Sequence, residues 1–337
     1  MLPATPGEVK RKFLIAGISV LYARPQCSSE IPKDTSDSIS FRTERSLVIY
    51  STVTWFWEVI VRLRTLRLGI LAGLNCLGLI AQISNGTSPA GARERIGRHH
   101  AGPIRDKTER TKGLADSTNW SGYAVLGSSF TSAAGSWVVP AAVCYAVSGD
   151  QYSSFWVGLD GYESNTVEQI GTDSDCVGTT PIYYAWYEFY PRNAFEILTV
   201  PVAPGNIISA SVTYNAGEFT VTISNKSTGQ SFSKNATVPG AARTSAEWIV
   251  EAPCCTKRPR DGILPLADFV MVGLGRDFSG QPGTNDAADS AINGPIGSFG
   301  AANIEQITKV GSSTSPQTST CSALTPDGTS FSCVWAP

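Results

Sequence analysis

The sequence predicts an all-β fold, an antiparallel β-sandwich or barrel that follows a poorly structured leader. From Asn119 onward the chain is a succession of short β-branched and aromatic runs, separated by clusters of Gly, Pro, Asn or Ser. No long run with the 3.6-residue period of a helix lies between them. Only 16% of the residues are charged, and the chain contains 32 Gly. Many short strands in a turn-rich composition indicate sheets that pack face to face or close into a barrel.

The individual strands follow from their residue patterns. We expect strands in the runs NWSGYAV (119–125), GSWVVP (135–140), SSFWVGLDGY (153–162), PIYYAWYEFYP (181–191), NAFEILTV (193–200), ISASVTYN (208–215), EFTVTISN (218–225) and TSAEWIVEA (244–252). Within residues 220–238, the loop NKSTGQ joins two alternating runs and predicts a hairpin.

The first 117 residues are predicted to be a leader in three parts. Residues 62–81 place basic residues before an apolar run that ends in small residues, which predicts a signal peptide. Residues 82–117 are rich in Arg, Lys, Gly and Pro and have no apolar period, so we expect a basic propeptide. Residues 1–61 are an upstream segment, and we expect translation to begin near Val61; a membrane anchor and an N-terminal helix pair are the alternatives. Residues 118–337 are the folded domain.

Charge divides unevenly between the leader and the domain. Residues 118–337 carry 9 Lys and Arg against 18 Asp and Glu, whereas residues 1–117 carry 17 against 10. The acidic domain lacks a basic patch that could neutralise phosphates, so we expect no nucleic-acid partner. The opposite charges predict attraction between the propeptide and the domain. Both histidines, His99 and His100, lie in the leader, which excludes Ser–His or Cys–His catalysis and histidine-ligated metal sites within the domain.

The cysteines predict disulfides. Six of the eight Cys lie in the domain and none forms a CxxC pair, which in an exported chain indicates disulfide bonds. Cys321 and Cys333 bracket a predicted hairpin and are the first expected pair. Cys144 with Cys176 is the second.

One predicted strand combines aromatic rings with a carboxylate. In YYAWYEFYP, period-2 alternation places Tyr184, Trp186, Glu188 and Tyr190 on one face and core-like residues on the other. The first face would suit an extended chain or a sugar, and an aromatic ladder with an exposed Glu is the alternative. Glu247 also stands alone in a strand-like run, where an outward-facing position on a sheet edge would explain it equally well.

No common catalytic motif is present. The sequence has no GxSxG, HExxH, P-loop or GxGxxG–helix unit, and no hydrophobic-Asp-[Ser/Thr]-Gly motif of aspartic proteases.

Six short motifs in order resemble the glutamic peptidases, or eqolisins, over residues 118 to the C-terminus. They are NWSGY (119–123), SWVVP (136–140), FWVGLDG (155–161), EQIGTD (168–173), YAWYEFYP (184–191) and TSAEWIVE (244–251). The resemblance implies a sandwich of two antiparallel, about seven-stranded sheets, concanavalin- or jelly-roll-like. It also implies a secreted, extracellular acid endopeptidase that is made as a zymogen and uses no cofactor or metal. Its partners would be protein or peptide substrates and its own propeptide, and the processed chain would be a monomer without stable membrane association.

The resemblance assigns the catalytic dyad to Gln169 and Glu247. A Glu with a pKa of about 4.3 can take a proton from water at acid pH, where a histidine would already be charged. The Gln169 amide can donate to the oxygen of the tetrahedral intermediate. The residues that match positions flanking the family's cleft, with supporting roles in orienting the dyad or binding substrate, are Trp156, Asp160, Asp173, Trp186, Glu188 and Tyr190. Tyr184 departs from the family, which carries an acidic residue there.

Two other functions compete with this interpretation. A carbohydrate-binding, lectin-like β-sandwich would use the aromatic face around Glu188 and would need neither Gln169 nor Glu247. A β-sandwich glycoside hydrolase would need Glu188 and Glu247 to face each other across a cleft at roughly 5–9.5 Å.

Overall fold

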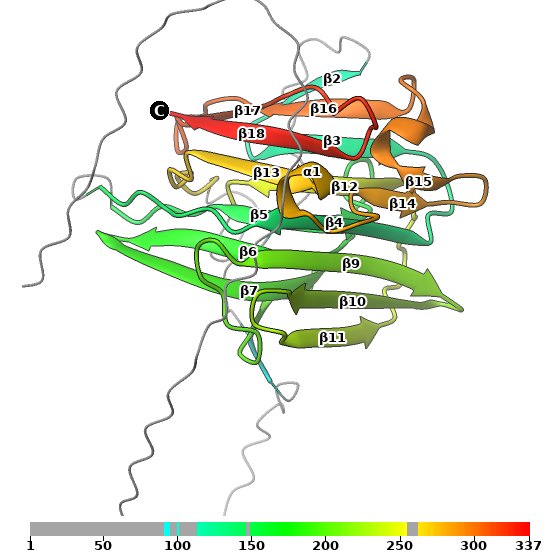
Figure 1. Ribbon diagram of the computed structural model, residues 1–337, viewed down its shortest axis with the longest axis horizontal. Coiled ribbons are helices and arrows are strands. Elements are labelled where there is room, and N and C mark those ends of the chain that lie inside the picture. The colour runs from blue at the N-terminus through cyan, green and yellow to red at the C-terminus, as the bar shows by residue number, and fades with distance from the viewer. Residues whose placement is uncertain (1–90, 95–99, 101–112, 146–148, 255–261) are drawn as a thin grey trace, which may run out of the picture. The chain divides into compact units, whose positions relative to one another are not determined.

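The computed structural model describes residues 91–94, 100, 113–145, 149–254 and 262–337. The segments predicted at residues 1–61 and 62–81 lie outside the described residues, as does most of the predicted propeptide. The described chain is almost entirely β-structure in two layers (Figure 1). None of its helices is long and apolar enough to cross a membrane.

The first layer carries the candidate site and contains seven strands side by side. In order across the layer they are β8 (Phe195–Ile197), β7 (Thr180–Tyr190), β6 (Val167–Val177), β5 (Ser154–Leu159), β12 (Ser245–Glu251), β3 (Trp120–Leu126) and β16 (Ile304–Lys309). These neighbours are all antiparallel. At the far edge, β2 (Leu114–Ser117) adds to β16 in the parallel direction. We call the side of this layer that faces away from the second layer the site face.

The second layer, which faces the viewer in Figure 1, also has seven strands. In order they are β17 (Thr318–Cys321), β18 (Ser330–Ala336), β13 (Met271–Gly275), β4 (Ser132–Val138), β9 (Ile207–Asn215), β10 (Glu218–Asn225) and β11 (Ser231–Ala236). The predicted hairpin at 220–238 is therefore confirmed as β10 and β11. Beside β4 lie β14 (Asp286–Ala288) and β15 (Asn293–Pro295), and the short helices are α1 (Arg276–Ser279) and η1 (Ile296–Phe299).

The two layers are joined at one point, so the number of sheets differs slightly from the two that were expected. Lys309 at the end of β16 pairs with Ser319 of β17, and β17 then pairs with β18. The 18 described strands consequently form one continuous hydrogen-bonded sheet that folds over itself. The all-β class and the two seven-stranded layers are confirmed. The layers are continuous because β17 forms hydrogen bonds with β16 of the first layer and with β18 of the second.

A hydrophobic core fills the space between the layers, and two indoles cross it. Trp137 of β4 donates its Nε1–H to the Thr172 hydroxyl of β6 at 2.9 Å. Trp248 of β12 donates to the Ala134 carbonyl of β4 at 2.6 Å. Both rings are fully buried. Since successive side chains of a strand point to opposite faces, the residues that alternate with Trp248 and Thr172 lie on the site face.

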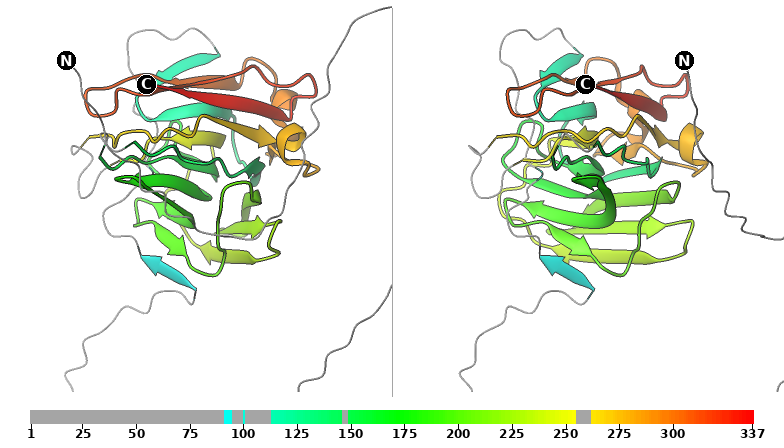
Figure 2. Two further views of the ribbon diagram at one scale, coloured as in Figure 1. Left: turned by 60° about the vertical axis from the view of Figure 1, so that its left-hand side comes forward. Right: turned by 90° about the vertical axis from the view of Figure 1, so that its left-hand side faces the viewer.

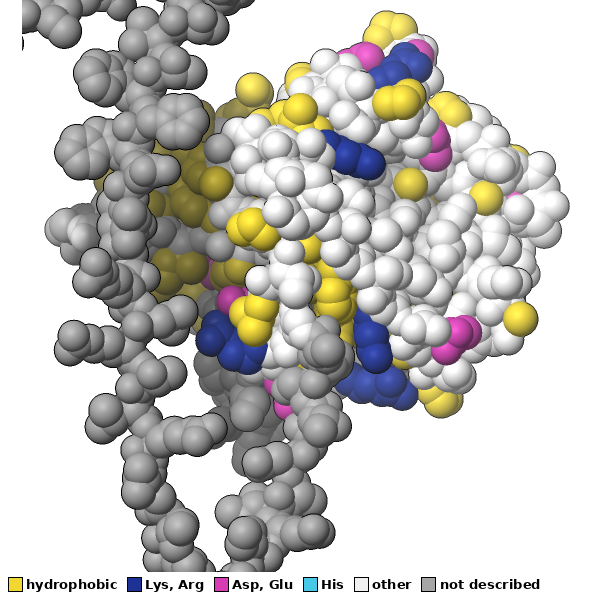
Figure 3. Space-filling view, turned by 60° about the horizontal axis from the view of Figure 1, so that its bottom comes forward, with side chains coloured by type: hydrophobic (Ala, Val, Ile, Leu, Met, Phe, Trp, Pro, Cys, Tyr) yellow, Lys and Arg dark blue, Asp and Glu magenta, His cyan; other side chains and the backbone are white. Residues whose placement is uncertain are grey.

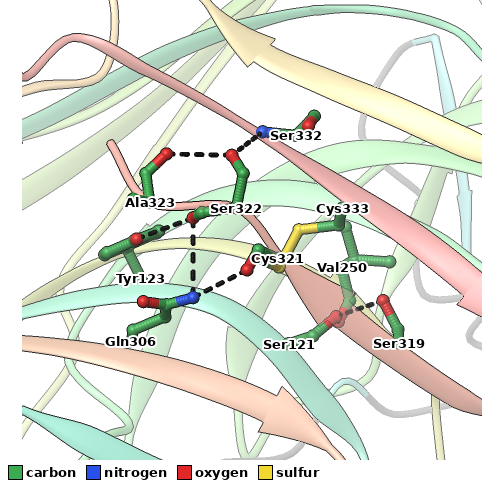
Figure 4. Close-up of a disulfide and its surroundings, with 10 residues drawn as sticks. All are labelled: Ser121, Tyr123, Val250, Gln306, Ser319, Cys321, Ser322, Ala323, Ser332 and Cys333. Carbon is green, nitrogen blue, oxygen red and sulfur yellow. Dashed lines mark hydrogen bonds between the residues drawn. A yellow bond between two sulfur atoms is a disulfide. The ribbon is translucent and has the colours of Figure 1, made fainter. Parts of the chain in front are cut away.

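Both predicted disulfides are present. Cys144–Cys176 closes a loop with a sequence separation of 32, and Cys321–Cys333 one of 12. Figure 4 shows Cys321–Cys333 near the corner where the layers join, with Gln306 donating to the Cys321 carbonyl at 2.7 Å. Loops of these sizes predict a stabilisation of about 3–4 kcal/mol for each bond in the chain-entropy account.

A short strand from the predicted propeptide extends the edge of the first layer. β1 (Ala92–Glu94) pairs antiparallel with β8, and Figure 2 shows it in cyan at the lower edge of the molecule. Arg93 forms an ion pair with Glu196 at 2.7 Å, and Asn193 donates to the Glu94 carboxylate at 2.6 Å. His100, which belongs to the same predicted propeptide, is six residues after Glu94 in the sequence.

Candidate active site

Gln169 and Glu247 lie in one row across the site face. Strand register pairs Glu247 of β12 with Gly158 of β5, and Gly158 with Gln169 of β6. Residues in register on adjacent strands point to the same face, and two strand spacings amount to about 10 Å. The residue between them is a glycine, so β5 places no side chain of its own at this point. The structure thus brings the two predicted dyad residues together around Gly158.

Alternation along the strands selects the members of the site face. On β12, Trp248 and Val250 enter the core between the layers, so Glu247, Ile249 and Glu251 occupy the site face. The prediction for β7 is confirmed in the same way. The core-facing residues of β7 are Tyr183, Ala185, Tyr187 and Phe189, whereas Tyr184, Trp186 and Tyr190 belong to a separate aromatic cluster on the site face.

The Gln169 amide is held by two acceptors. Its Nε2 donates to the Glu188 carboxylate at 3.3 Å and to the backbone carbonyl of His100 at 2.6 Å. By distance and angle, its Oε1 and both carboxyl oxygens of Glu247 are buried without a hydrogen-bond partner among the described residues. The Ser245 side chain and the Tyr162 backbone nevertheless lie near enough to Glu247 to favour its ionised form. The Gln169 Oε1 can accept a hydrogen bond from a water molecule.

Two of the predicted supporting residues contact neighbours of the dyad. Trp156 is fully buried and donates its Nε1–H to the Glu251 carboxylate at 2.9 Å. Asp160 follows β5 and accepts hydrogen bonds from the backbone N–H groups of Arg243 at 2.7 Å and Thr244 at 3.0 Å. Asp160 thereby fixes the chain just before β12, three residues from Glu247.

The remaining supporting residues lie on β6 and β7. The Tyr184 hydroxyl lies within hydrogen-bond distance of the carboxyl groups of both Asp173 and Asp175, at 2.9 Å from Asp175, and its single proton can be donated to either one. Trp186 stacks on the imidazole ring of His100, with 3.6 Å between ring centroids and an interplanar angle of 1°. Tyr190 is half-buried at the end of β7. All six residues therefore lie on, or directly beside, the strands that carry the dyad.

Several carboxyl groups are buried close together in and around the site. Asp173, Asp175, Glu188, Glu247 and Glu251 are all buried. On the face shown in Figure 3, Lys and Arg side chains and Asp and Glu side chains are scattered among uncharged ones. Packing this many carboxyl groups into a desolvated region disfavours ionising all of them at once.

Burial shifts the acidity of two glutamates on the site face. It raises the pKa of Glu247 well above 4.5, and the charges of Asp160 and Glu168 add to the effect. It also raises the pKa of Glu251 to about 8, although the nearby His100 opposes the shift. The expectation of a pKa near 4.3 for Glu247 is therefore wrong for this state of the protein, because the sequence could not show how completely the carboxyl group is shielded from water.

The buried carboxyl group of Glu168, the residue before Gln169, should make the folded protein more stable in acid than at neutral pH. Burial raises the pKa of Glu168 to about 9 from 4.5, and Asp160 adds to the shift. The folded chain then keeps a proton that the unfolded chain releases above about pH 4.5. The free energy of unfolding is therefore highest in acid and falls as the pH rises from about 4.5 towards 9. We expect Glu168→Gln to match the wild type at pH 3–4 and to be roughly 3 kcal/mol more stable at pH 7.

Urea unfolding at pH 4 and pH 7 measures this difference. Glu218→Gln, on the exposed face of β10, is the matched control and should leave the pH dependence unchanged. An equal loss of stability between pH 4 and pH 7 in Glu168→Gln and the wild type would contradict the assignment.

Sequence reasoning did not single out four residues of the site. They are His100, Ser154, Gly158 and Glu251. Glu251 could have been found, because it alternates with Glu247 in SAEWIVE and must share its face. Gly158 required the register between β5, β6 and β12. His100 is 69 residues from Gln169, and no local pattern connects the two.

Comparisons with known proteins identify the family of this chain. The family model described as the peptidase A4 family matches residues 118–325. Aspergillopepsin-2 of Aspergillus niger is 30% identical over 180 residues, covering 46% of this chain and 62% of the relative. Scytalidopepsin B of Scytalidium lignicola is 33% identical over 159 residues, covering 45% and 59%. The matched part thus spans less than two thirds of the length of these relatives.

A solved structure shows the same fold. The crystal structure of scytalido-glutamic peptidase with a transition state analog inhibitor superposes with a TM-score of 0.52 and 25% identity, covering 65% of this chain and 98% of the solved one. The shared fold covers almost the whole of that peptidase, and the family model spans the strands that carry Gln169 and Glu247. On this evidence the chain belongs to the peptidase A4 family.

Proposed function

We propose that this protein is an acid endopeptidase in which Gln169 and Glu247 activate a water molecule for attack on a peptide bond. The observation that carries the proposal is the row Glu247–Gly158–Gln169 on the buried site face, with the Gln169 amide already bonded to a peptide carbonyl at 2.6 Å. Family membership and the structural likeness to a solved glutamic peptidase support the same reaction class.

The proposed reaction needs only these two side chains and water. Gln169 Nε2 donates to the carbonyl oxygen of the substrate and stabilises the negative charge that develops there. The Gln169 Oε1 and the Glu247 carboxylate hold the water, and Glu247 takes its proton as the oxygen attacks the carbonyl carbon. Glu247 then gives the proton to the leaving amine, and the C–N bond breaks without a covalent enzyme intermediate.

The other site residues position this pair. Glu188 accepts a hydrogen bond from the Gln169 Nε2, which directs the amide Oε1 away from Glu188 and leaves it available to the water. Asp160 fixes the start of β12, and Trp156 is anchored by Glu251. A misplacement of about 1 Å at such a site can lower the rate by about 10²-fold, so these contacts matter although they do not touch the reacting atoms.

Glu247 must be ionised to act as a base. Burial is the largest cause of its raised pKa, so a water molecule that hydrates the carboxyl group lowers the pKa and favours ionisation. The enzyme is proposed to rest with Glu247 protonated and to become active when the attacking water binds beside the carboxyl group.

Secretion belongs to the same proposal. The disulfides Cys144–Cys176 and Cys321–Cys333 suit an oxidising extracellular environment. The charge contrast between the leader and the domain suits a propeptide that stays associated until it is removed.

The register disfavours the glycosidase alternative. Glu188 is in register with Gln169, so three strand spacings, about 14 Å between backbones, separate it from Glu247. Gln169 lies between the two carboxyl groups in the same row. A lectin-like site would leave the pairing of Gln169 and Glu247 around Gly158 without a role.

Digestion of an unfolded protein substrate tests the proposed function. The full-length chain, incubated with acid-denatured haemoglobin between pH 2 and pH 7, should release peptides in acid and should be insensitive to pepstatin, which blocks aspartic proteases. Porcine pepsin in the same assay is the control for the inhibitor. Absence of digestion throughout this pH range, or complete inhibition by pepstatin, would contradict the proposal.

A further inference from the structure

His100, from the predicted propeptide, is buried in the site with the dyad. Its side chain is 1% exposed, in contact with residues of β5, β6 and β7. β1, a few residues upstream, pairs with β8 at the edge of the same layer. His100, from the same predicted propeptide, thus occupies the place next to Gln169.

The backbone of His100 is bound as the backbone of a substrate would be. Its carbonyl oxygen accepts a hydrogen bond from Gln169 Nε2 at 2.6 Å, and its N–H donates to Glu188 Oε2 at 2.9 Å. The side chains of Gln169 and Glu188 thus bind both main-chain groups of His100. The carbonyl that bonds to Gln169 is the one that the proposed mechanism would attack.

The side chain of His100 fills a slot that matches a cationic ring. The imidazole stacks on Trp186 with ring centroids 3.6 Å apart. Its Nδ1 lies 3.2 Å from Glu188 Oε2 and its Nε2 lies 3.0 Å from the Ser154 hydroxyl, with Asp173 Oδ1 at 3.8 Å. A flat aromatic wall with acidic groups at both ring nitrogens favours an imidazolium over an apolar or acidic side chain.

The electrostatics of the slot support a charged ring. Burial by itself lowers the pKa of His100, but hydrogen bonds with Asp173 and Glu188 and the charges of Asp173 and Glu251 outweigh it and raise the pKa to about 9. The ring consequently stays protonated from acid to neutral pH. Its occupation of the slot does not depend on histidine titration near pH 6.5.

We propose that the slot formed by Ser154, Asp173, Trp186 and Glu188 selects histidine as the residue that supplies the carbonyl of the cut bond, and that the chain cleaves itself after His100. This inference rests on the proposed function and adds the substrate residue and the processing site. In this proposal His100 blocks the site before processing and is also the first substrate residue.

The chemical step is a simple hydrolysis. The water oxygen forms a bond to the carbonyl carbon of His100 while Glu247 takes one water proton. The bond from that carbon to the nitrogen of Ala101 breaks, and Glu247 returns the proton to the departing nitrogen. The products are a carboxyl group on His100 and a new amino terminus at Ala101.

Processing of the full-length chain tests the cut site. After incubation at pH 3–5, N-terminal sequencing and intact mass should give a product that starts at Ala101. Glu247→Gln should stay uncut in the same incubation. His100→Glu should slow cleavage after position 100 at least tenfold, whereas His100→Arg, which keeps the positive charge, should stay within about threefold of the wild type. His99→Glu is the matched control for an added negative charge one residue away, and it should be processed at the normal rate.

Peptide kinetics test the slot separately from the processing reaction. Processed enzyme should cut RIGRHHAGPIR, residues 95–105 of the chain, after the second histidine. It should prefer this peptide about tenfold in kcat/KM over the version with Leu at position 100. Ser154→Ala should reduce that preference severalfold, because it removes the group opposite Nε2.

The outcomes separate the inference from the proposed function. If the chain digests haemoglobin in acid but its new amino terminus lies elsewhere, or if the two peptides are cut equally well, the slot and the processing site are wrong and the peptidase activity stands. If no protein or peptide is cut, both proposals fail.

Discussion

Replacing Glu247 by Gln should lower kcat for peptide hydrolysis at acid pH by at least about 10³-fold, and Gln169→Ala should lower it by about 10²–10³-fold. Glu247 is the residue of β12 that lies in register with Gln169 across Gly158, and an amide in its place cannot take a proton from water. Removing the Gln169 amide leaves the oxyanion without its donor, and loss of one such donor costs about 10²–10³-fold. The two losses should not add in the double variant, because the residues act as one unit.

The variants must be measured as processed, folded domains. Because Glu247→Gln is not expected to process itself, wild-type enzyme can remove its leader and then be separated by an affinity tag. Near-ultraviolet circular dichroism and thermal unfolding report whether the fold is retained. Glu218→Gln and Gln230→Ala, both exposed in the second layer, are the matched controls and should keep full activity. A rate within tenfold of the wild type for either dyad variant would show that the dyad is assigned incorrectly.

Glu188→Gln separates the peptidase from the glycosidase interpretation. Glu188 contacts Gln169 and the occupant of the slot but lies three strand spacings from the proposed base, Glu247. Its neutral amide should therefore weaken positioning and histidine preference without removing the chemistry. A larger loss in Glu188→Gln than in Glu247→Gln would favour paired glutamates as the catalytic groups.

Much of the fold could be predicted because its information is local. Alternation in YYAWYEFYP separates Ala185 and Tyr187, which enter the core, from Trp186, which lies on the site face. The spacing of Cys321 and Cys333 around a turn also indicated their bond. The joining of the two layers was not predictable in this way. It depends on a single register pair, Lys309 with Ser319, whose residues carry no distinctive pattern.

The candidate site was only partly predictable for the same reason. Glu247 attracts notice because a charge within a strand of buried residues requires an explanation. Gln169 does not, since a lone Gln on a strand is ordinarily an outward polar residue, and only the resemblance to a family singled it out. His100 could be predicted to be attracted to the acidic domain by its basic surroundings. Its insertion beside Gln169 depends on contacts between residues 69 to 88 positions apart.

Gly158→Ala should nearly inactivate the enzyme, although it adds only one methyl group. A Cβ at position 158 would lie 2.8 Å from Cζ3 of Trp156, 3.1 Å from the Glu168 carbonyl oxygen and 3.3 Å from Cβ of Gln169. The methyl group would therefore occupy the space between the two dyad residues and push Trp156 and Gln169 aside. A shift of about 1 Å in a catalytic group lowers the rate by about 10²-fold, and we expect a fall in kcat of at least that size.

The fold should survive this change, which makes the loss of activity informative. Overpacking of this kind typically costs about 1–3 kcal/mol, and Gly158 does not have the positive φ that would make any side chain strained. Gly294→Ala in β15 is the matched control. There a new Cβ would meet only the hydroxyl end of Ser298 at 3.1 Å and its Cβ at 3.7 Å, which can move away. We expect Gly294→Ala to keep wild-type kcat, and Gly158→Ala to show a cooperative thermal transition with almost no turnover. A folded Gly158→Ala enzyme with a rate within threefold of the wild type would mean that the attacking water is not held between Gln169 and Glu247.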